Sequence, residues 1–265
     1  MNEVVEKMLE AAENGEADAL RKLGQYYHYG YGVEQDDVKA FECYLEAARD
    51  GYTPAMHDLA KCYRLGEGVD KDDVLAFEWL LEASKEGNIF AMHDLANCYR
   101  FGVGVEQDYI QAFEWYLKSS RNGITYATHD LGICYYKGQG VERDYVQAFE
   151  CYLESATEGY WPAMHDLANC YRFGVGVEQD YDQAFIWYLM ASKSGVAYTT
   201  HDLGKCYYNG QGVERDYVQA FEYYLESATE GYWPAMHDLA ICYRYGHGVE
   251  QDVAKAEEWD RRAEE

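Results

Sequence analysis

Residues 93–109 read HDLANCYRFGVGVEQDY, and the same seventeen residues recur at 165–181. The two copies lie 72 residues apart, which is twice a shorter period that fills the chain. One glycine marks that period of 36, at Gly15, Gly51, Gly87, Gly123, Gly159, Gly195 and Gly231. A fixed period of this length is typical of stacked units, each too small to bury its apolar face alone. The repeat therefore predicts a solenoid.

Two segments in each period have helical spacing. Ala91, Leu95 and Tyr99 are spaced i, i+4, i+8, and Phe113 and Leu117 are spaced i, i+4 in the following segment. Both spacings place apolar side chains on one face of an α-helix. Each unit is therefore expected to be a pair of helices, which need their neighbours for stability because short helices are marginal alone.

The residues between these segments predict the turns and helix ends. A glycine pair such as Gly66 and Gly68 permits positive φ where the chain reverses. Pro54 sits just inside the start of a first helix, where a missing N–H costs least. An acidic residue is placed to cap the second helix of each unit, at Asp36, Asp72, Asp108, Asp144, Asp180 and Asp216.

The period also predicts the boundaries. We expect one domain over 1–265, with a capping helix at 1–15 as an N-terminal half-repeat. Seven repeats follow at 16–51, 52–87, 88–123, 124–159, 160–195, 196–231 and 232–265. The last helix is a polar end cap, because Glu257 and Asp260 stand where an earlier unit has Phe113 and Tyr116.

The repeated residues resemble a known family. In the third unit they are Ala91, Leu95, Ala96, Tyr99, Gly102, Gly104, Val105, Asp108, Ala112, Phe113, Trp115 and Tyr116. This pattern resembles the Sel-one-like repeat over nearly the whole chain. The resemblance implies an all-α fold, a right-handed α/α superhelical solenoid with a concave groove, used mainly by scaffold and adaptor proteins. It implies no particular partner, since fold alone does not fix function.

Charge limits the partners. Lys and Arg number 22 against 48 Asp and Glu, a formal net charge of −26. Nucleic acid and anionic membranes would repel such a chain, so we expect no binding to either. The acidic surface serves either solubility or steering toward a basic partner.

Cysteine spacing and the absence of an apolar leader predict a cytoplasmic protein. Six cysteines recur once per unit, at Cys62, Cys98, Cys134, Cys170, Cys206 and Cys242. Stacked helices are ~8–10 Å apart, whereas a disulfide needs Cα atoms within about 7 Å. We therefore expect reduced thiols. Neither a signal peptide nor an apolar stretch of membrane-spanning length is apparent.

A His-Asp pair is the most unusual repeated feature, and only the first unit departs from it, with Arg21 and Lys22. Residues four and seven positions after each His share its helix face, which by resemblance to tetratricopeptide modules lines the groove. The predicted partner-binding residues are His57, His93, His129, His165, His201, His237, Asn97, Asn169, Arg64, Arg100, Arg172, Arg244, Tyr136, Tyr208, Phe101 and Phe173. His28 and His247 lie outside this ladder, and the sequence suggests no partner for either.

Three interpretations of the ladder remain open. Each His is a structural residue bonded to a neighbouring repeat, or it contacts carboxylates of a bound peptide, or it binds a metal. Metal binding is the least favoured, because histidines about 10 Å apart cannot share an ion with ligands at ~2 Å.

We interpret the chain as a non-enzymatic scaffold that binds a protein or peptide in its groove, as a monomer without a cofactor. A catalytic triad needs one unique nucleophile and base, whereas here nearly every Cys and His has copies. One alternative is an acidic inhibitor or immunity-type protein that neutralises a basic partner. The other is a β-lactamase-like hydrolase, an activity reported for cysteine-rich cousins whose cysteine pattern is absent here.

Overall fold

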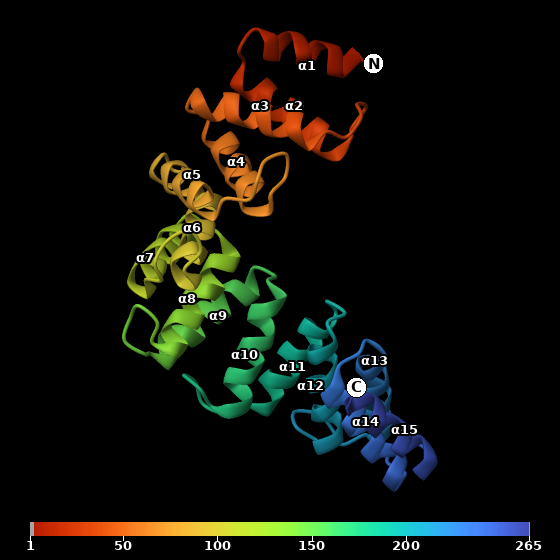
Figure 1. The fold of residues 1–265 in the computed structure, drawn as a ribbon. Coiled ribbons are helices and arrows are strands. Elements are labelled where there is room, and N and C mark those ends of the chain that lie inside the picture. The colour runs from red at the N-terminus through yellow and green to blue at the C-terminus, as the bar shows by residue number, and fades with distance from the viewer. Residues whose placement is uncertain (1–2, 265) are drawn as a thin grey trace. The chain divides into compact units, whose positions relative to one another are not determined.

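We analysed a computed structural model of the chain, which describes the backbone of residues 3–264 and the side chains of residues 7–12 and 14–264. This part of the chain holds fifteen α-helices and no strand. In chain order they are α1 (Glu3–Glu13), α2 (Ala17–Tyr29), α3 (Asp37–Arg49), α4 (Thr53–Leu65), α5 (Asp73–Lys85), α6 (Ile89–Phe101), α7 (Tyr109–Arg121), α8 (Thr125–Lys137), α9 (Tyr145–Thr157), α10 (Trp161–Phe173), α11 (Tyr181–Ser192), α12 (Ala197–Asn209), α13 (Tyr217–Thr229), α14 (Trp233–Tyr245) and α15 (Val253–Glu264) (Figure 1).

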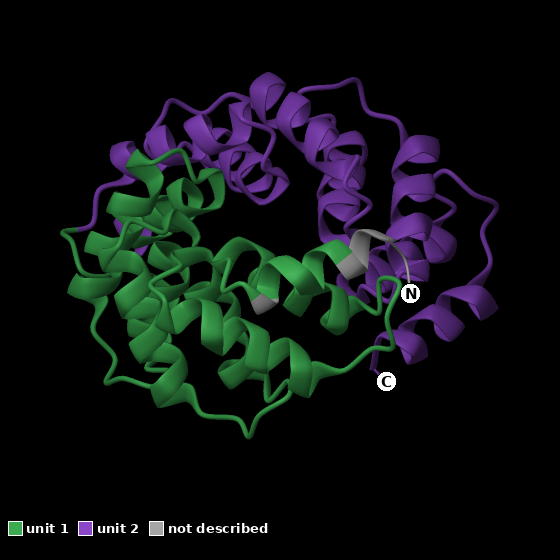
Figure 2. Cartoon of the chain, turned by 90° about the horizontal axis from the view of Figure 1, so that it is seen from above, with its two compact units in different colours: residues 1–134, 138–142 green, residues 135–137, 143–265 purple. Residues whose placement is uncertain are grey.

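The chain divides into two compact units (Figure 2). Unit 1 comprises residues 1–134 and 138–142, and unit 2 comprises residues 135–137 and 143–265. We call the even-numbered helices from α2 to α14 the A helices and the odd-numbered helices from α3 to α15 the B helices. Within each of the two compact units, an A helix packs against the B helix that follows it. That B helix then packs against the next A helix, as α3 does with α4.

Small apolar side chains hold each pair together. Ala91 and Leu95 of α6 are buried, as the predicted stripe requires, whereas its third member, Tyr99, is half-buried. Cys98 is buried as well. Tyr116 of α7 is fully buried and lies beside the buried Ala112. Removing this apolar surface from water drives the helices together, at roughly 25 cal/mol per Å². The helices can approach closely because alanine rather than leucine occupies much of the contact.

The two glycines of the recurring pair are required for different reasons. Gly102 ends α6 in the left-handed region with φ 68°, and its N–H donates to the carbonyl of Cys98. Gly104, with φ 69°, lies against the preceding repeat, where a Cβ would fall 1.9 Å from the carbonyl oxygen of Asp73. The first glycine therefore serves the turn, and the second serves the close approach of one repeat to the next.

The predicted caps are confirmed. Asp72 accepts hydrogen bonds from the backbone N–H groups of Val74 and Leu75, and its own N–H donates to the carbonyl of Tyr63 on the A helix. The six aspartates that the sequence predicts as caps all accept from backbone N–H groups of their helices, as seen for Asp36, Asp72, Asp108, Asp144, Asp180 and Asp216. Pro54 lies in the first turn of α4.

The expectation of an all-α repeat solenoid is thus confirmed, while a single domain over 1–265 stays a prediction. All eight cysteines lie among the described residues and are free thiols, six of them buried. Within the described residues, no helix is both long enough and apolar enough to cross a membrane.

Candidate functional site

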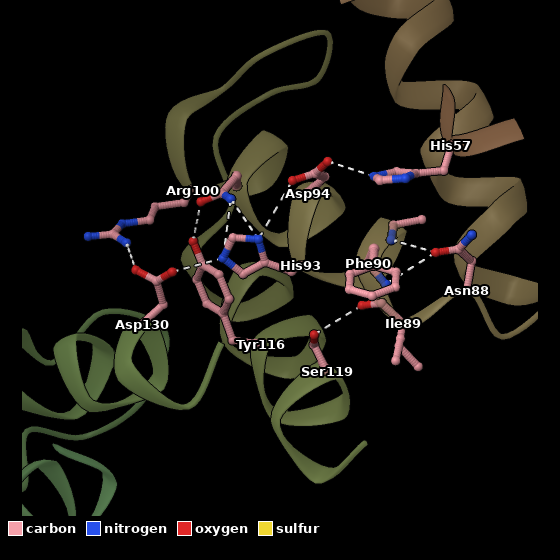
Figure 3. Close-up of polar contacts among 12 residues, drawn as sticks. His57, Asn88, Ile89, Phe90, His93, Asp94, Arg100, Tyr116, Ser119 and Asp130 are labelled. Atoms are coloured by element: carbon pink, nitrogen blue, oxygen red, sulfur yellow. Dashed lines mark hydrogen bonds and ion pairs between the residues drawn. The ribbon is translucent and has the colours of Figure 1, made fainter. Parts of the chain in front are cut away.

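The His-Asp ladder joins consecutive repeats rather than neighbours in sequence. Nε2 of His57 in α4 lies 2.9 Å from Oδ2 of Asp94 in α6, and Nε2 of His93 lies 2.9 Å from Oδ2 of Asp130 in α8 (Figure 3). In unit 2, Nε2 of His201 lies 2.7 Å from Oδ2 of Asp238. Each of these histidines therefore holds the aspartate 37 positions later, so the hydrogen bond ties one A helix to the next.

An arginine shares the carboxylate with the histidine in repeats 3 and 5, and again in the last repeat. Nη1 of Arg100 donates to Oδ1 of Asp130 at 2.8 Å (Figure 3). In unit 2, Asp202 accepts from Arg172 at 3.3 Å and is hydrogen-bonded to His165 at 3.0 Å. Two donors on one carboxylate make a charge-assisted network, which is stronger than a bond between neutral groups.

Burial and charge shift the pKa values along this network. Burial opposes the charged imidazolium of His93, but hydrogen bonds to Asp130 and Asp94 outweigh it and hold its pKa above the ordinary value. The same balance raises the pKa of His165 to about 9. Burial likewise opposes the charged form of Asp202, yet its hydrogen bond to His165 and the nearby Lys205 lower its pKa to about 2. The His165–Asp202 pair is therefore charged near neutral pH.

The first and last repeats complete the ladder with different residues. Nε of Arg21, which replaces histidine, donates to Asp58 at 2.6 Å. In the last repeat, Nδ1 of His237 lies 3.4 Å from Oδ1 of Asp260 in α15, and Arg244 also pairs with Asp260. The polar residues of α15, which the sequence suggests only as an end cap, thus provide the carboxylate that the next A helix supplies elsewhere.

These contacts favour the structural interpretation for most of the ladder. His57, His129 and His201 are buried, while His237 is exposed at 59% of its side chain. Asn97 and Asn169 also have internal partners, because each accepts a hydrogen bond from the hydroxyl of the buried tyrosine on the B helix, Tyr116 or Tyr188. The predicted partner-binding set stays a prediction, but its members differ greatly in their freedom to meet a ligand.

The predicted aromatic residues lie nearer the solvent. Phe101 and Phe173 are exposed by 62% and 63%, with the guanidinium groups of Arg100 and Arg172 about 5 Å from their ring centroids. Tyr136 is exposed and contacts the ring of Tyr145.

His28 and His247, for which the sequence suggests no partner, each have one in the structure. Nδ1 of His28 lies 2.8 Å from Oδ1 of Asp37, and Nδ1 of His247 lies 2.8 Å from the hydroxyl of Tyr208. Both contacts join a turn or helix end to a helix, and no fixed spacing in the sequence announces them.

One opening in unit 1 lies along α2, α4 and α6. It is a hollow of about 470 Å³, lined by Arg21, His57, Asp58, Lys61, Arg64, Phe90, His93, Asp94 and Tyr126. Arg21, Lys61 and Arg64 face two carboxylates there, those of Asp58 and Asp94. The hollow is therefore cationic within a chain of net charge −26.

Lys61 and Arg64 have no hydrogen-bonded or ion-paired side chain among the described residues, although both are partly buried. Arg64 corresponds to Arg100, which is paired with Asp130. The buried tyrosine near Arg100, Tyr116, is replaced in this repeat by the equally buried Leu80, which offers no hydroxyl. In repeat 3 the residues at these two positions, Asn97 and Arg100, are hydrogen-bonded to other side chains. In repeat 2, Lys61 and Arg64 make no such bond within the described residues.

No metal site emerges in the part of the chain that the structure describes, where no three His, Cys, Asp or Glu side chains are grouped to hold an ion. The chemistry available to the hollow is instead charge-assisted hydrogen bonding to an anionic group.

Known proteins share the repeat of this chain. The model of the Sel1 repeat matches seven consecutive segments, at 17–52, 53–88, 89–124, 125–160, 161–196, 197–232 and 233–265. The chain belongs to the Sel1 repeat family. The matches begin one residue later than the repeat boundaries that the glycine period predicts.

Two solved structures share the Sel1 fold. A protective antigen present in uropathogenic Escherichia coli strains is 32% identical, with a TM-score of 0.93 over 100% of this chain and 56% of that chain. A Sel1 repeat protein from Oxalobacter formigenes is 26% identical, with a TM-score of 0.80 over 98% of this chain and 75% of its own.

A curated relative, an uncharacterised Sel1-like repeat-containing protein of Schizosaccharomyces pombe, is 53% identical over 34 residues, or 13% of this chain. The chain spans only 5% of that protein and little more than half of the E. coli chain. Sel1 solenoids act in general as scaffolds for protein interaction.

Proposed function

We propose that this protein is a non-enzymatic scaffold that binds a protein or peptide along its A helices, with a carboxylate of the partner seated in the unit 1 hollow. The observation that carries the proposal is the pair Lys61 and Arg64, two cations without a hydrogen-bonded or ion-paired side chain among the described residues, although the charge of Arg64 helps to lower the pKa of Asp94. An arginine and a lysine that are partly removed from water and make no hydrogen bond gain from an anionic oxygen.

The surroundings of the pair support a peptide rather than a small anion. Phe90 is half exposed at the edge of the hollow and Tyr126 lines it, so aliphatic or aromatic parts of a partner can pack beside the charged contact. A second opening of about 440 Å³ shares Arg21, His57 and Phe90 with the hollow and extends the surface toward Ile89. A peptide that places a carboxylate in the hollow could thus rest its neighbouring residues in this second opening.

The acidic character of the whole protein limits the partner further. A highly acidic segment would be repelled by the net charge of −26 at long range. We therefore expect a partner that is neutral or basic overall and places one or two carboxylates in the hollow. The free cysteines support action in a reducing compartment.

The test is a selection from a displayed peptide library with the wild-type protein, followed by anisotropy with the selected peptides. In Lys61→Met/Arg64→Met, affinity should fall at least tenfold, because bonds to charged groups contribute about 1.5–3 kcal/mol each. Replacing the Asp or Glu of the peptide by its amide should cause a similar loss in the wild type and little further loss in the double variant.

The matched control is Lys85→Met/Arg121→Met, which removes the same charge from the exposed ends of α5 and α7. Equal affinity in the wild type and the Lys61/Arg64 double variant would refute the proposal. Binding that survives both double variants yet weakens steeply with salt would support instead an inhibitor that meets a basic partner through its acidic surface.

A further inference from the structure

A second cavity, in unit 2, is built differently from the unit 1 hollow. It measures about 190 Å³ and lies among α12, α13 and α14, where Lys205, Tyr208, Asn209, Tyr224, Asp238 and Ile241 line it. These residues supply an ammonium group, two phenols, an amide, a carboxylate and one aliphatic side chain. Such a mixture differs from an apolar packing defect, which would be lined by hydrocarbon and stay empty.

The hydroxyl of Tyr224 has no hydrogen-bond partner among the described residues, although Tyr224 is only 2% exposed. The hydroxyl of the buried Tyr188, one repeat earlier, is satisfied, since it donates to Oδ1 of Asn169 at 2.7 Å. Lys205 replaces that asparagine in the Tyr224 repeat, and a lysine ammonium cannot accept a hydrogen bond. Because Tyr224 lines the cavity, a ligand atom or ordered water there can bond to this hydroxyl.

Gly204 explains the position of this ring. A Cβ at residue 204 would lie 2.8 Å from ring atoms of Tyr224, closer than non-bonded carbons approach. The preceding repeat has Ala168 in this place. The glycine therefore lets the ring lie flush against α12, and the hydroxyl is left facing the cavity rather than a partner on that helix.

The carboxylate beside Lys205 is shared with other donors. Its Nζ lies 3.2 Å from Oδ1 of Asp202, but that carboxylate also serves His165 and Arg172. His165 is protonated near neutral pH, since its pKa is raised to about 9, and it faces Asp166 as well. Asp202 therefore serves three cationic side chains, and Lys205 is only one of them. Across the cavity, one oxygen of Asp238 is engaged by His201.

We propose that this cavity binds a carboxylate group on a short aliphatic chain. Lys205 Nζ and the Tyr224 hydroxyl donate to the carboxylate, and Ile241 contacts the aliphatic part. The group can belong to a free small carboxylic acid or to a glutamate side chain of a partner. The site lies wholly in unit 2 and does not require the unit 1 hollow to bind anything.

The experiment uses the full chain with ¹³C-labelled isoleucine methyl groups. Ile241 lines the cavity, Ile89 lines the opening beside the unit 1 hollow, and Ile110 is exposed on α7 as a reference. Three probes are titrated: glutarate, its neutral diamide glutaramide, and the peptide acetyl-Ala-Glu-Ala-amide. Glutarate or the peptide should shift the Ile241 methyl resonance saturably and leave Ile110 unmoved, whereas glutaramide should have no effect.

Two variants test the donors. Tyr224→Phe and Lys205→Met should each weaken the Ile241 response about tenfold, as expected for the loss of one hydrogen bond to a charged group. Tyr188→Phe is the matched control, because it removes a hydroxyl that already has an internal partner. Leu80 fills the equivalent position of repeat 2, so the repeat packs without this hydroxyl, and far-UV circular dichroism checks the fold of each variant.

The outcomes distinguish a free small acid from a partner's glutamate side chain, and binding in the unit 2 cavity from binding in the unit 1 hollow. Saturable binding of glutarate alone assigns a free small acid, and equal or tighter binding of the peptide assigns a partner side chain. An unmoved Ile241 resonance, an equal response to glutaramide, or full affinity in both Tyr224→Phe and Lys205→Met would overturn the proposal. A response at Ile89 alone would leave the unit 1 proposal standing and remove this one.

Discussion

Replacing Asp130 by asparagine tests whether the ladder holds the repeats together. The carboxylate of Asp130 meets Nε2 of His93 at 2.9 Å and Nη1 of Arg100 at 2.8 Å, and the three side chains are 18%, 13% and 13% exposed. Asparagine keeps the shape and one acceptor oxygen but removes the charge. Arg100 would then lose its ion-paired carboxylate, and His93 would keep only Asp94, whose Oδ1 lies 3.6 Å from its Nδ1.

The magnitude follows from these contacts. Two hydrogen bonds to charged groups contribute about 3–6 kcal/mol together, and breaking a buried pair from one side costs about 3–5 kcal/mol. The amide oxygen of asparagine recovers part of this, and His93 can lose its proton. We therefore expect Asp130→Asn to reduce the free energy of unfolding by about 2–4 kcal/mol.

Urea unfolding followed by circular dichroism measures the global effect. Hydrogen exchange of amides in α6 and α8 measures the local one, because repeat arrays need not unfold in a single step. The control is Glu106→Gln, which removes one negative charge from an exposed turn and should cost less than about 0.5 kcal/mol. A loss below about 1 kcal/mol in Asp130→Asn, or unchanged exchange in both helices, would refute a stacking role for the ladder.

Three further predictions concern the pH dependence of His165, the close approach at Gly104 and the burial of Cys98. The folded-state pKa of His165 lies at about 9, above the ordinary 6.5, so the stabilisation from its charged pair with Asp202 is complete below pH 6.5 and is lost as pH rises through 9. Urea unfolding should show that the free energy of unfolding falls by about 3 kcal/mol over that window. An equal pH dependence in His165→Asn would contradict this. Gly104→Ala should cost about 3 kcal/mol or more by thermal melting, because its Cβ meets a carbonyl, whereas Gly87→Ala, with open space around it, should cost only about 1–2 kcal/mol of backbone strain; equal costs would count against the close approach. Burial raises the pKa of the Cys98 thiol to about 11, so it should react with Ellman's reagent at pH 8 only when the protein unfolds, and rapid reaction in native buffer would argue against that burial.

Local chemistry made most of the fold predictable. The roles of Gly102 and Asp72 depend on backbone conformation within a few residues, which the sequence reports directly. Gly104 is only half predictable: its positive φ follows from the turn, but its contact with Asp73 depends on how closely two repeats stack.

The candidate site was less predictable, because it depends on contacts between repeats. His57 could have been paired with Asp94 by noting that both recur every 36 residues, yet the reach between A helices is a three-dimensional quantity. Arg64 looks identical to Arg100 in sequence. Its freedom arises where leucine replaces tyrosine at residue 80 of the facing helix, a difference that acts only through packing.

The ladder has a consequence for how such chains change length. His57 is hydrogen-bonded to Asp94 of the next repeat. The block 93–164 begins with a His-Asp pair, and the residues that follow the block, 165 and 166, are again His and Asp. Excision of that block would bring Asp166 into the place of Asp94, with an identical side chain and the same offset of 37. Insertion of a further copy would preserve every donor and acceptor equally well. Because each interface accepts any neighbour with this pair, a gene encoding such a chain can gain or lose 72-residue blocks by unequal recombination while each new junction remains chemically matched.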